Sequence, residues 1–236
     1  MVSQDDFALP ESKLPIHPTY KVSDWDVPRA YDWQRFVARL RQVREGHEIT
    51  ADDVRVSEDD AISWSEEERS KLSLWTETLR KSASNVDNDV QLVILDGFLI
   101  LGDLDCTSEE IWNRKHSPKS EWTDTNPKSS LRLQVRRLLD IKVFLRVSRE
   151  VLQKRRDTRE YDTAEGTTWK DPPGYFDQVV WPAYVHCHEP LFKELESPRK
   201  DGNGIQCIDM DIQSMSHAIE IVVNQIASRL NSAKSR

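Results

Sequence analysis

Three runs of apolar and β-branched residues divide the chain and limit the folds open to it. They cover residues 90–95, 141–147 and 204–209, and a helical pattern follows the second and the third. A nearly continuous apolar run is typical of a strand buried on both faces of a parallel sheet. Because such strands alternate with helices here, the sequence predicts an α/β layered fold with a parallel sheet.

Helical periodicity and capping residues mark five helices around these runs. The first is expected from about Asp26, which would be its N-cap, with Pro28 in the first turn. Ser148 is the expected N-cap of another helix. The other three helices are expected at residues 66–80, 174–195 and 214–230.

Charge and hydropathy exclude several classes of protein. Residues 45–68 hold ten acidic residues and one basic residue, which predicts a flexible acidic insertion; an acidic segment with its own function is the alternative. The net charge of −8 argues against a general nucleic-acid binder, which needs a basic face. We find no apolar run of membrane-spanning length and no signal peptide, and therefore expect a soluble, cytoplasmic protein.

The cysteines offer little evidence of a metal site or a disulfide framework. Cys106, Cys187 and Cys207 are widely separated and include no CxxC pair, so reduced structural thiols are expected. The run His186-Cys187-His188 suggests a metal site, but residues two apart on a helix point to different faces. Metal binding at this run is therefore not expected.

Two acidic patterns carry candidate chemistry, and each also has an ordinary structural explanation. Asp5-Asp6 could bind Mg²⁺ or accept a proton from a hydroxyl, although paired acids are also common in turns and helix caps. Asp96 ends a predicted strand, where ligands of open α/β sheets bind, but it could equally be an ordinary turn residue.

Two further patterns lie in the second half of the chain. The basic segment 154–159 is suited to neutralising phosphate oxygens, although cations are also favoured at a helix C-terminus. Residues 172–177, followed by Trp181-Pro182, indicate by themselves only a rigid loop that leads into an aromatic helix.

Together these patterns resemble the nicotinamide riboside kinases, and they occur in the order found in that family. The match is similar to the fungal branch and extends from Ser3 to about Leu230. The segments that carry it are Ser3-Gln4-Asp5-Asp6-Phe7 with Pro10-Glu11, Trp25-Asp26, Leu95-Asp96-Gly97-Phe98-Leu99, Arg155-Arg156 through Arg159 and Tyr161, and Pro173-Gly174-Tyr175-Phe176-Asp177 with Trp181-Pro182. The first and last of these segments separate the family from the related uridine kinases.

The resemblance implies a P-loop kinase fold: one α/β domain over residues 1–236, with a five-stranded parallel sheet between helices and a small lid at 155–173. The implied reaction transfers the γ-phosphoryl group of ATP, with Mg²⁺, to the 5′-hydroxyl of nicotinamide riboside, giving nicotinamide mononucleotide for NAD synthesis. The expected partners are a small nucleoside and ATP, without nucleic acid or a membrane. A uridine kinase-like enzyme and a non-catalytic relic that binds a nucleoside or a partner are the alternatives.

The resemblance also implies roles for individual residues. Asp5 would be the base and a Mg²⁺ ligand, and Asp96 would be a second Mg²⁺ ligand. Trp25 would stack on the pyridinium ring, and Asp26 would bind the ribose hydroxyls. Arg156 would face the substrate and the transferring phosphoryl group.

The remaining implied contacts complete the two pockets. Asp6 and Phe7 would also bind the substrate, while ATP would be bound by Arg155, Arg159 and Tyr161. Ala8 departs from the family pattern, which has a second Phe at this position.

The phosphate loop of the P-loop kinases, G-x-x-x-x-G-K-[ST], is the main departure. None of the seven glycines in the sequence is followed by Lys. The resemblance places this loop and the family's first strand ahead of Ser3, so we expect an incomplete N-terminus, or a real loss. In either case, residues 1–236 alone are expected to lack useful kinase activity.

Overall fold

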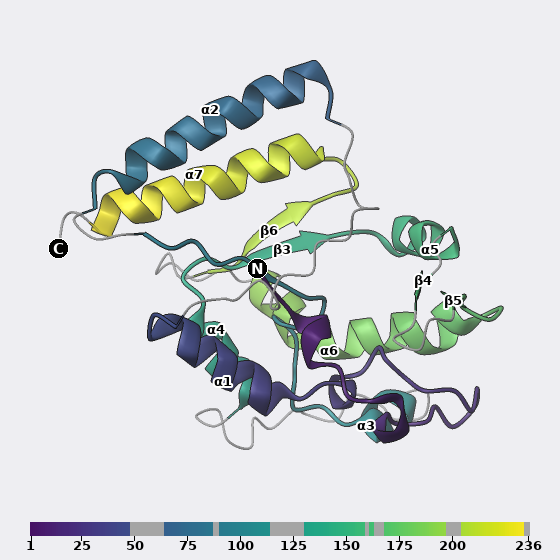
Figure 1. The fold of residues 1–236 in the computed structure, drawn as a ribbon. Helices are drawn as coiled ribbons and strands as arrows, with labels where there is room; N and C mark the ends of the chain where they lie inside the picture. The colour runs from purple at the N-terminus through teal and green to yellow at the C-terminus, as the bar shows by residue number, and fades with distance from the viewer. Residues whose placement is uncertain are drawn as a thin grey trace. The chain divides into compact units, whose positions relative to one another are not determined.

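The computed structural model describes residues 1–47, 64–86, 90–113, 130–158, 161–162, 168–196 and 204–233. The chain divides into two units, drawn as a ribbon in Figure 1. Unit 1 consists of Met1–Ile49, Leu95–Asp140 and Ser148–Gly204, and unit 2 of Thr50–Ile94, Ile141–Val147 and Ile205–Arg236. The expectation that residues 1–236 form a single domain stays a prediction.

Unit 1 is built from helices around a pair of short parallel strands. In that pair, β1 (Val2–Ser3) lies beside β2 (Leu95–Asp96), with Ser3 opposite Asp96. A small antiparallel pair joins β4 (Tyr161–Asp162) to β5 (Thr168–Trp169). The helices are α1 (Trp33–Arg44), α3 (Ser108–Asn113), α4 (Leu131–Leu138), α5 (Arg149–Asp157) and α6 (Trp181–Glu196), with a π-helix, Phe176–Val180, leading into α6.

Unit 2 combines a second parallel strand pair with two long helices. β3 (Val143–Arg146) lies beside β6 (Gln206–Asp209), with Phe144 opposite Cys207. α2 (Glu66–Ala83) and α7 (Met215–Ala233) lie side by side, as Figure 1 shows. The predicted α/β class with parallel strand pairing is therefore confirmed, while the five-stranded P-loop kinase sheet stays a prediction.

One predicted helix cap and three predicted helices lie where the sequence placed them. Ser148 Oγ accepts a hydrogen bond from Val151 N at 3.4 Å, which caps α5. The helices expected at 66–80, 174–195 and 214–230 are present as α2, the π-helix with α6, and α7. These signals lie within a few residues of the helix they define, so no distant partner is needed to form them.

Two predictions about local structure were wrong. Leu95 alone of the run at 90–95 lies in a strand, Leu95–Asp96, and the run is not buried on both faces, since Leu92 is 53% and Ile94 59% exposed. Asp26 does not cap the first helix; α1 begins at Trp33, and Asp32 is its N-cap. In the first case the described partner strand is only two residues long, and in the second the carboxylate is engaged elsewhere.

The acidic segment at 45–68 can be assessed only at its ends. Residues 48–63 lie outside the described residues. Glu66, Glu67 and Glu68 form the first turn of α2, where the positive end of the helix dipole stabilises acidic side chains, and the flexible insertion stays a prediction. Among the described residues, we find no helix with the length and apolarity needed to cross a membrane.

Candidate functional site

Asp5 sits in a short 3-10 helix that directly follows strand β1. The helix, Gln4–Phe7, is capped by Ser3, whose Oγ accepts a hydrogen bond from Asp5 N at 3.3 Å. Gln4 is fully buried, and its Oε1 accepts a hydrogen bond from Leu99 N at 2.9 Å. Asp5 is exposed, and Asp96 is the last residue of β2. Both carboxylates therefore lie at the carboxyl ends of paired parallel strands, where ligands of open α/β sheets bind.

Close packing against Gln4 requires a glycine after β2. A Cβ atom added at Gly97 would lie 2.5 Å from Gln4 Cβ and 2.7 Å from Ile100 Cδ1. Gln4 is not free to move aside, because its side-chain oxygen is bonded to Leu99 N. Gly97 therefore allows the segment after β2 to support the turn that carries Asp5.

The segment that follows Asp5 pairs with the segment around Tyr31. Leu9 N donates a hydrogen bond to Ala30 O at 2.8 Å, and an isolated antiparallel bridge lies next to it. Burial and the nearby carboxylates of Asp5 and Asp26 raise the pKa of Tyr31. Tyr31 is thus within electrostatic range of both acids, which lie in the same region of unit 1.

A tight turn at Lys21, whose φ of 56° is in the left-handed region, leads the chain back to Asp24. Asp24 is completely buried, and its backbone N donates to Pro15 O at 2.8 Å. The Asp24 carboxylate accepts hydrogen bonds from Trp112 Nε1 at 2.9 Å and from Asp26 N at 3.1 Å. Burial raises the pKa of Asp24 in spite of these two donors, and the carboxylate fixes the backbone of Asp26.

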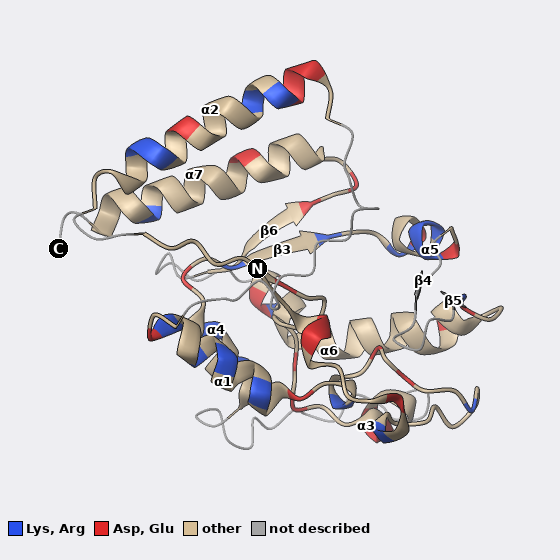
Figure 2. Cartoon of the chain, in the orientation of Figure 1, with Lys and Arg blue, Asp and Glu red and all other residues tan. Residues whose placement is uncertain are grey.

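Arg156 binds two carboxylates at the end of α5, whose last turn is basic (Figure 2). Its Nη1 donates to Asp26 Oδ1 at 3.2 Å, and its Nε donates to Asp171 Oδ2 at 2.7 Å. The side chains of Arg156, Asp26 and Asp171 are only 20%, 11% and 10% exposed. The planar guanidinium therefore joins α5 to Asp171, 15 positions further on, and to Asp26, 130 positions earlier in the chain.

Asp26 has a raised pKa, mainly because it is buried. Its burial is the main cause that raises its pKa, to about 6, and Asp24 and Asp171 raise it further. Arg156 opposes these effects, since its positive charge favours the ionised carboxylate. The carboxylate is therefore ionised at neutral pH but titrates well above the usual range for an aspartate.

Unit 1 also contains exposed groups of different chemistry near Asp26 in the chain or in the same region. Trp25 precedes Asp26 in the chain and is 38% exposed, so part of its indole surface faces solvent. An indole can stack on a flat cationic ring, and a carboxylate can accept hydrogen bonds from neighbouring hydroxyls. Asp5 adds an exposed carboxylate that can accept a proton. These groups suit a polar ligand with both an aromatic cation and hydroxyls.

Comparison with known proteins gives relatives with one shared description. The nicotinamide riboside kinase of Saccharomyces cerevisiae is 26% identical over 233 residues, which cover 96% of this chain and 83% of that protein. The nicotinamide riboside kinase of Schizosaccharomyces pombe is 25% identical over 195 residues, covering 81% of this chain and 68% of that protein. The chain is a relative of the nicotinamide riboside kinases.

This finding confirms the resemblance drawn from the sequence motifs. Nicotinamide riboside kinase 1 of Homo sapiens is also similar, at 28% identity over 120 residues, covering 49% of this chain and 43% of that protein. No family model and no solved structure matches the chain.

The structure brings together some of the residues that the resemblance to these kinases singled out. Asp26 and Arg156 are in direct contact, and Asp5 lies in the same region. Phe7 is a core residue whose ring packs edge-on against Phe36, 5.1 Å between centroids, so its contact with a substrate stays a prediction. The adjacent Asp6 is half-buried, and its predicted role is likewise untested.

The predicted nucleotide-binding residues are described only in part. Arg155 is exposed on α5, next to Arg156. Arg159 lies outside the described residues, and Tyr161 is described only by its backbone in β4. Their contacts with ATP therefore stay predictions, as does the lid at 155–173.

The predicted Mg²⁺ ligands are Asp5 and Asp96. Within the described ranges we find no group of three or more His, Cys, Asp or Glu side chains that could hold a metal ion. Two carboxylates nevertheless suit Mg²⁺, which prefers oxygen ligands and usually takes most of them from water and phosphate. The role of Asp5 and Asp96 as Mg²⁺ ligands stays a prediction.

The sequence did not single out Asp24, Trp112 or Asp171. Asp24 contacts Trp112 across 88 positions, and Asp171 contacts Arg156 across 15. No local spacing relates such partners, so a single sequence offers no motif for them. The one available signal is Asp24 itself, an acid two residues before Asp26 in a segment without helical periodicity.

Proposed function

We propose that this chain carries the nucleoside-binding part of a nicotinamide riboside kinase, which transfers the γ-phosphoryl group of ATP to the 5′-hydroxyl of the nucleoside. The observation that supports this most is the buried contact between Asp26 and Arg156, directly after the exposed Trp25 in the chain. The yeast relatives, similar over most of the chain, give it independent support. The product would be nicotinamide mononucleotide, which serves NAD synthesis.

In this proposal Trp25 and Asp26 recognise the two halves of the nucleoside. The indole of Trp25 stacks on the cationic pyridinium ring, where its π face is attracted to the positive charge. The carboxylate of Asp26 accepts hydrogen bonds from the ribose hydroxyls, and Asp24 holds the backbone of Asp26 in place. Arg156 orients Asp26 and directs positive charge toward the phosphoryl group.

Asp5 is the proposed base for the reaction. Its exposed carboxylate follows β1 and takes the proton from the attacking hydroxyl. With Asp96 it would hold Mg²⁺, which neutralises charge on the phosphates when it is bound. Arg155, Arg159 and Tyr161 are the proposed ATP contacts.

The phosphate loop is the part that the 236 residues do not supply. Its backbone N–H groups and Lys orient ATP and stabilise charge in the transition state, effects worth several orders of magnitude in rate. We therefore expect no useful turnover from residues 1–236. Joining the phosphate-loop segment of a yeast relative ahead of Val2 should restore it. A coupled ADP-release assay compares the two chains with nicotinamide riboside; turnover by residues 1–236 near about 10 s⁻¹ would contradict the proposal.

Nucleoside binding can be tested without phosphoryl transfer. In calorimetric titrations of residues 1–236, Trp25→Ala should weaken nicotinamide riboside binding by roughly 5- to 30-fold, which corresponds to about 1–2 kcal/mol. The loss for uridine should be smaller, because its base is neutral, whereas Asp26→Ala should weaken both nucleosides equally. Ile16→Ala, an exposed apolar residue of the same loop, is the control and should change neither.

The possible outcomes separate the candidate functions. Unchanged binding of nicotinamide riboside by Trp25→Ala would make Trp25 a packing residue and remove the proposed base pocket. Tighter binding of uridine than of nicotinamide riboside would favour a uridine kinase-like enzyme. Normal binding, with no turnover after the phosphate-loop segment is joined, would favour a non-catalytic relic.

A further inference from the structure

Two cysteines that the proposed reaction does not use lie in contact inside unit 1. The sulfur atoms of Cys106 and Cys187 are 3.3 Å apart, although the two residues are 81 positions apart in the chain. Cys106 precedes α3, and Cys187 lies within α6. Both are buried, Cys106 at 4% and Cys187 at 0% exposure. The sulfurs are therefore neighbours without being bonded.

The backbones around the two cysteines are held together by several contacts. Asp103 N donates to Cys187 O at 2.6 Å, and Cys106 Sγ donates to Asp103 O at 3.2 Å. A Cβ atom added at Gly102 would lie 3.0 Å from Cys187 O, so the two segments pack backbone to backbone. The remaining step to the bonded S–S distance of about 2.05 Å is small, and side-chain rotation can supply most of it.

A cleft gives Cys106 access to small solutes. The cleft has a volume of about 520 Å³, and Leu104, Asp105, Cys106 and Thr107 form one side of it. Cys187 does not line the cleft and lies behind Cys106. A small reagent that enters the cleft therefore meets Cys106 first, with Cys187 in position to react second.

We propose that Cys106 and Cys187 are a redox modification site, which a peroxide entering the cleft converts to a disulfide. The Cys106 thiolate attacks one oxygen of hydrogen peroxide, the O–O bond breaks, and Cys106 becomes a sulfenic acid. Cys187 then attacks the Cys106 sulfur, the S–S bond forms, and the hydroxyl leaves as water with the thiol proton. In sum, two thiols lose two electrons and two protons to one peroxide, which becomes two water molecules.

The surroundings make this a slow modification and not a peroxidase reaction. The contact with Cys187, burial, and the carboxylates of Asp103 and Glu110 all raise the pKa of Cys106. Since the thiolate is the reacting form, the modification accumulates during sustained exposure to the oxidant. A disulfide here ties α6 to the segment whose Leu99 N is bonded to Gln4, next to Asp5.

The test uses residues 1–236 with hydrogen peroxide, followed by alkylation of remaining thiols and peptide mapping by mass spectrometry without reduction. A linked pair of peptides should contain Cys106 and Cys187, lighter by two hydrogen atoms than the separate peptides. Cys207, on β6 of unit 2, is the matched control, and Cys207→Ser should leave the linkage intact. Cys106→Ser and Cys187→Ser should each abolish it.

A second measurement does not depend on the folding of the variants. Oxidation of the natural chain should raise its thermal unfolding midpoint by about 5 °C or more, and a reducing dithiol should reverse the rise. The proposal is overturned if Cys207 is oxidised while Cys106 and Cys187 remain separate thiols. It is equally overturned if the linkage joins Cys207 or two different chains, or if the linked chain unfolds at an unchanged temperature.

Discussion

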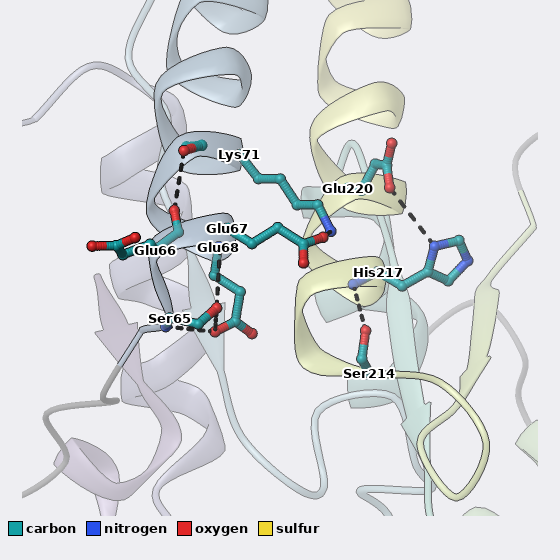
Figure 3. A network of polar contacts seen from close by, with 9 residues as sticks. Ser65, Glu66, Glu67, Glu68, Lys71, Ser214, His217 and Glu220 are labelled. Atoms are coloured by element: carbon teal, nitrogen blue, oxygen red, sulfur yellow. Dashed lines mark hydrogen bonds and ion pairs between the residues drawn. The ribbon is translucent and has the colours of Figure 1, made fainter.

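Charged side chains form two kinds of contact in this molecule, one between close neighbours in the sequence and one between remote residues. On α2 and α7 the contacts join residues three or four positions apart, as Figure 3 shows: Lys71 Nζ lies 2.8 Å from Glu67, and His217 lies 3.8 Å from Glu220. In unit 1, by contrast, Arg156 reaches Asp26 across 130 positions, and both side chains are largely buried.

The difference teaches which charges determine the fold. Exposed pairs within one helix contribute little individually, because water solvates each partner when the other is removed. A buried group cannot be solvated in this way, so losing one partner leaves an uncompensated charge. The α2 and α7 contacts therefore make only small contributions to helix stability, whereas the Arg156 contacts favour the pairing of remote segments.

The largest test of this contrast removes one arginine from each group. Arg156→Met should lower the free energy of unfolding by about 3–5 kcal/mol, because Asp26 and Asp171 lose their shared partner inside unit 1. Arg80→Met breaks an exposed pair with Glu77 on α2 and should leave it nearly unchanged. Urea unfolding measures the free energy of unfolding of both variants. Equal decreases would show that the buried and the exposed ion pairs contribute alike.

The charge state of Asp26 gives a pH-dependent version of the same test. Its pKa is raised from 3.8 to about 6, so the folded chain binds a proton that the unfolded chain has released between these values. Ionisation of Asp26 therefore lowers the free energy of unfolding as pH rises from about 4 to 6. Asp26→Asn lacks this loss and should gain up to about 3 kcal/mol relative to the natural chain over that range.

Urea unfolding at several pH values between 4 and 7 checks this, and the difference between variant and natural chain is the quantity of interest. Ser73→Ala, which replaces an exposed residue of α2 and removes no titratable group, is the control. Its difference from the natural chain should stay constant over the range. Parallel curves for Asp26→Asn would show that Asp26 titrates as an ordinary aspartate.

A change of one methyl group tests a long-range contact that involves no charge. Gly97→Ala should lower the free energy of unfolding by about 2 kcal/mol, because the new Cβ would overlap with Gln4 and Ile100. Gly204→Ala is the control, since a Cβ there meets no atom within 4 Å. Thermal unfolding of both variants provides the measurement. If Gly97→Ala leaves the free energy of unfolding unchanged, the turn that carries Asp5 can move to make room for the new Cβ.

The smallest expected effect lies at the start of α2. Ser65 and Glu68 form a reciprocal capping box, shown in Figure 3, and these bonds lower the pKa of Glu68. Ser65→Ala should lower the free energy of unfolding by about 1 kcal/mol. Ser73→Ala, exposed within α2, should have no destabilising effect, because alanine favours the helix interior. If both variants have the same free energy of unfolding, the Ser65 cap does not stabilise unit 2.

The same contrast explains what the sequence could predict. Ser148 was identified as a cap because its partner, Val151 N, is three residues away. Asp26 was assigned to a cap by the same logic and is instead an ion-pair partner, because Arg156 is remote in the chain. Asp24 and Asp171 were missed for this reason.

Strand prediction at 90–95 failed for a related cause. Composition and branching at Cβ favour a strand, but a strand forms only where another strand accepts its hydrogen bonds, and Val2–Ser3 pairs only with Leu95–Asp96. Asp5 and the basic segment 154–159 are candidates from their residue types, whereas the roles of Trp25 and Asp26 come from the resemblance and could not be derived from spacing. The order of the motifs along the chain supports that resemblance.

The distance between Asp26 and Arg156 also has a consequence for synthesis of the chain. The ribosome adds about 5–20 residues per second, so the 130 positions between them take roughly 7 to 26 s. During this interval Asp26 has been synthesised, but the guanidinium that pairs with it has not yet been made. The ion pair forms only after α5 has been translated, so nascent chains lack this contact until more than half of the protein is complete.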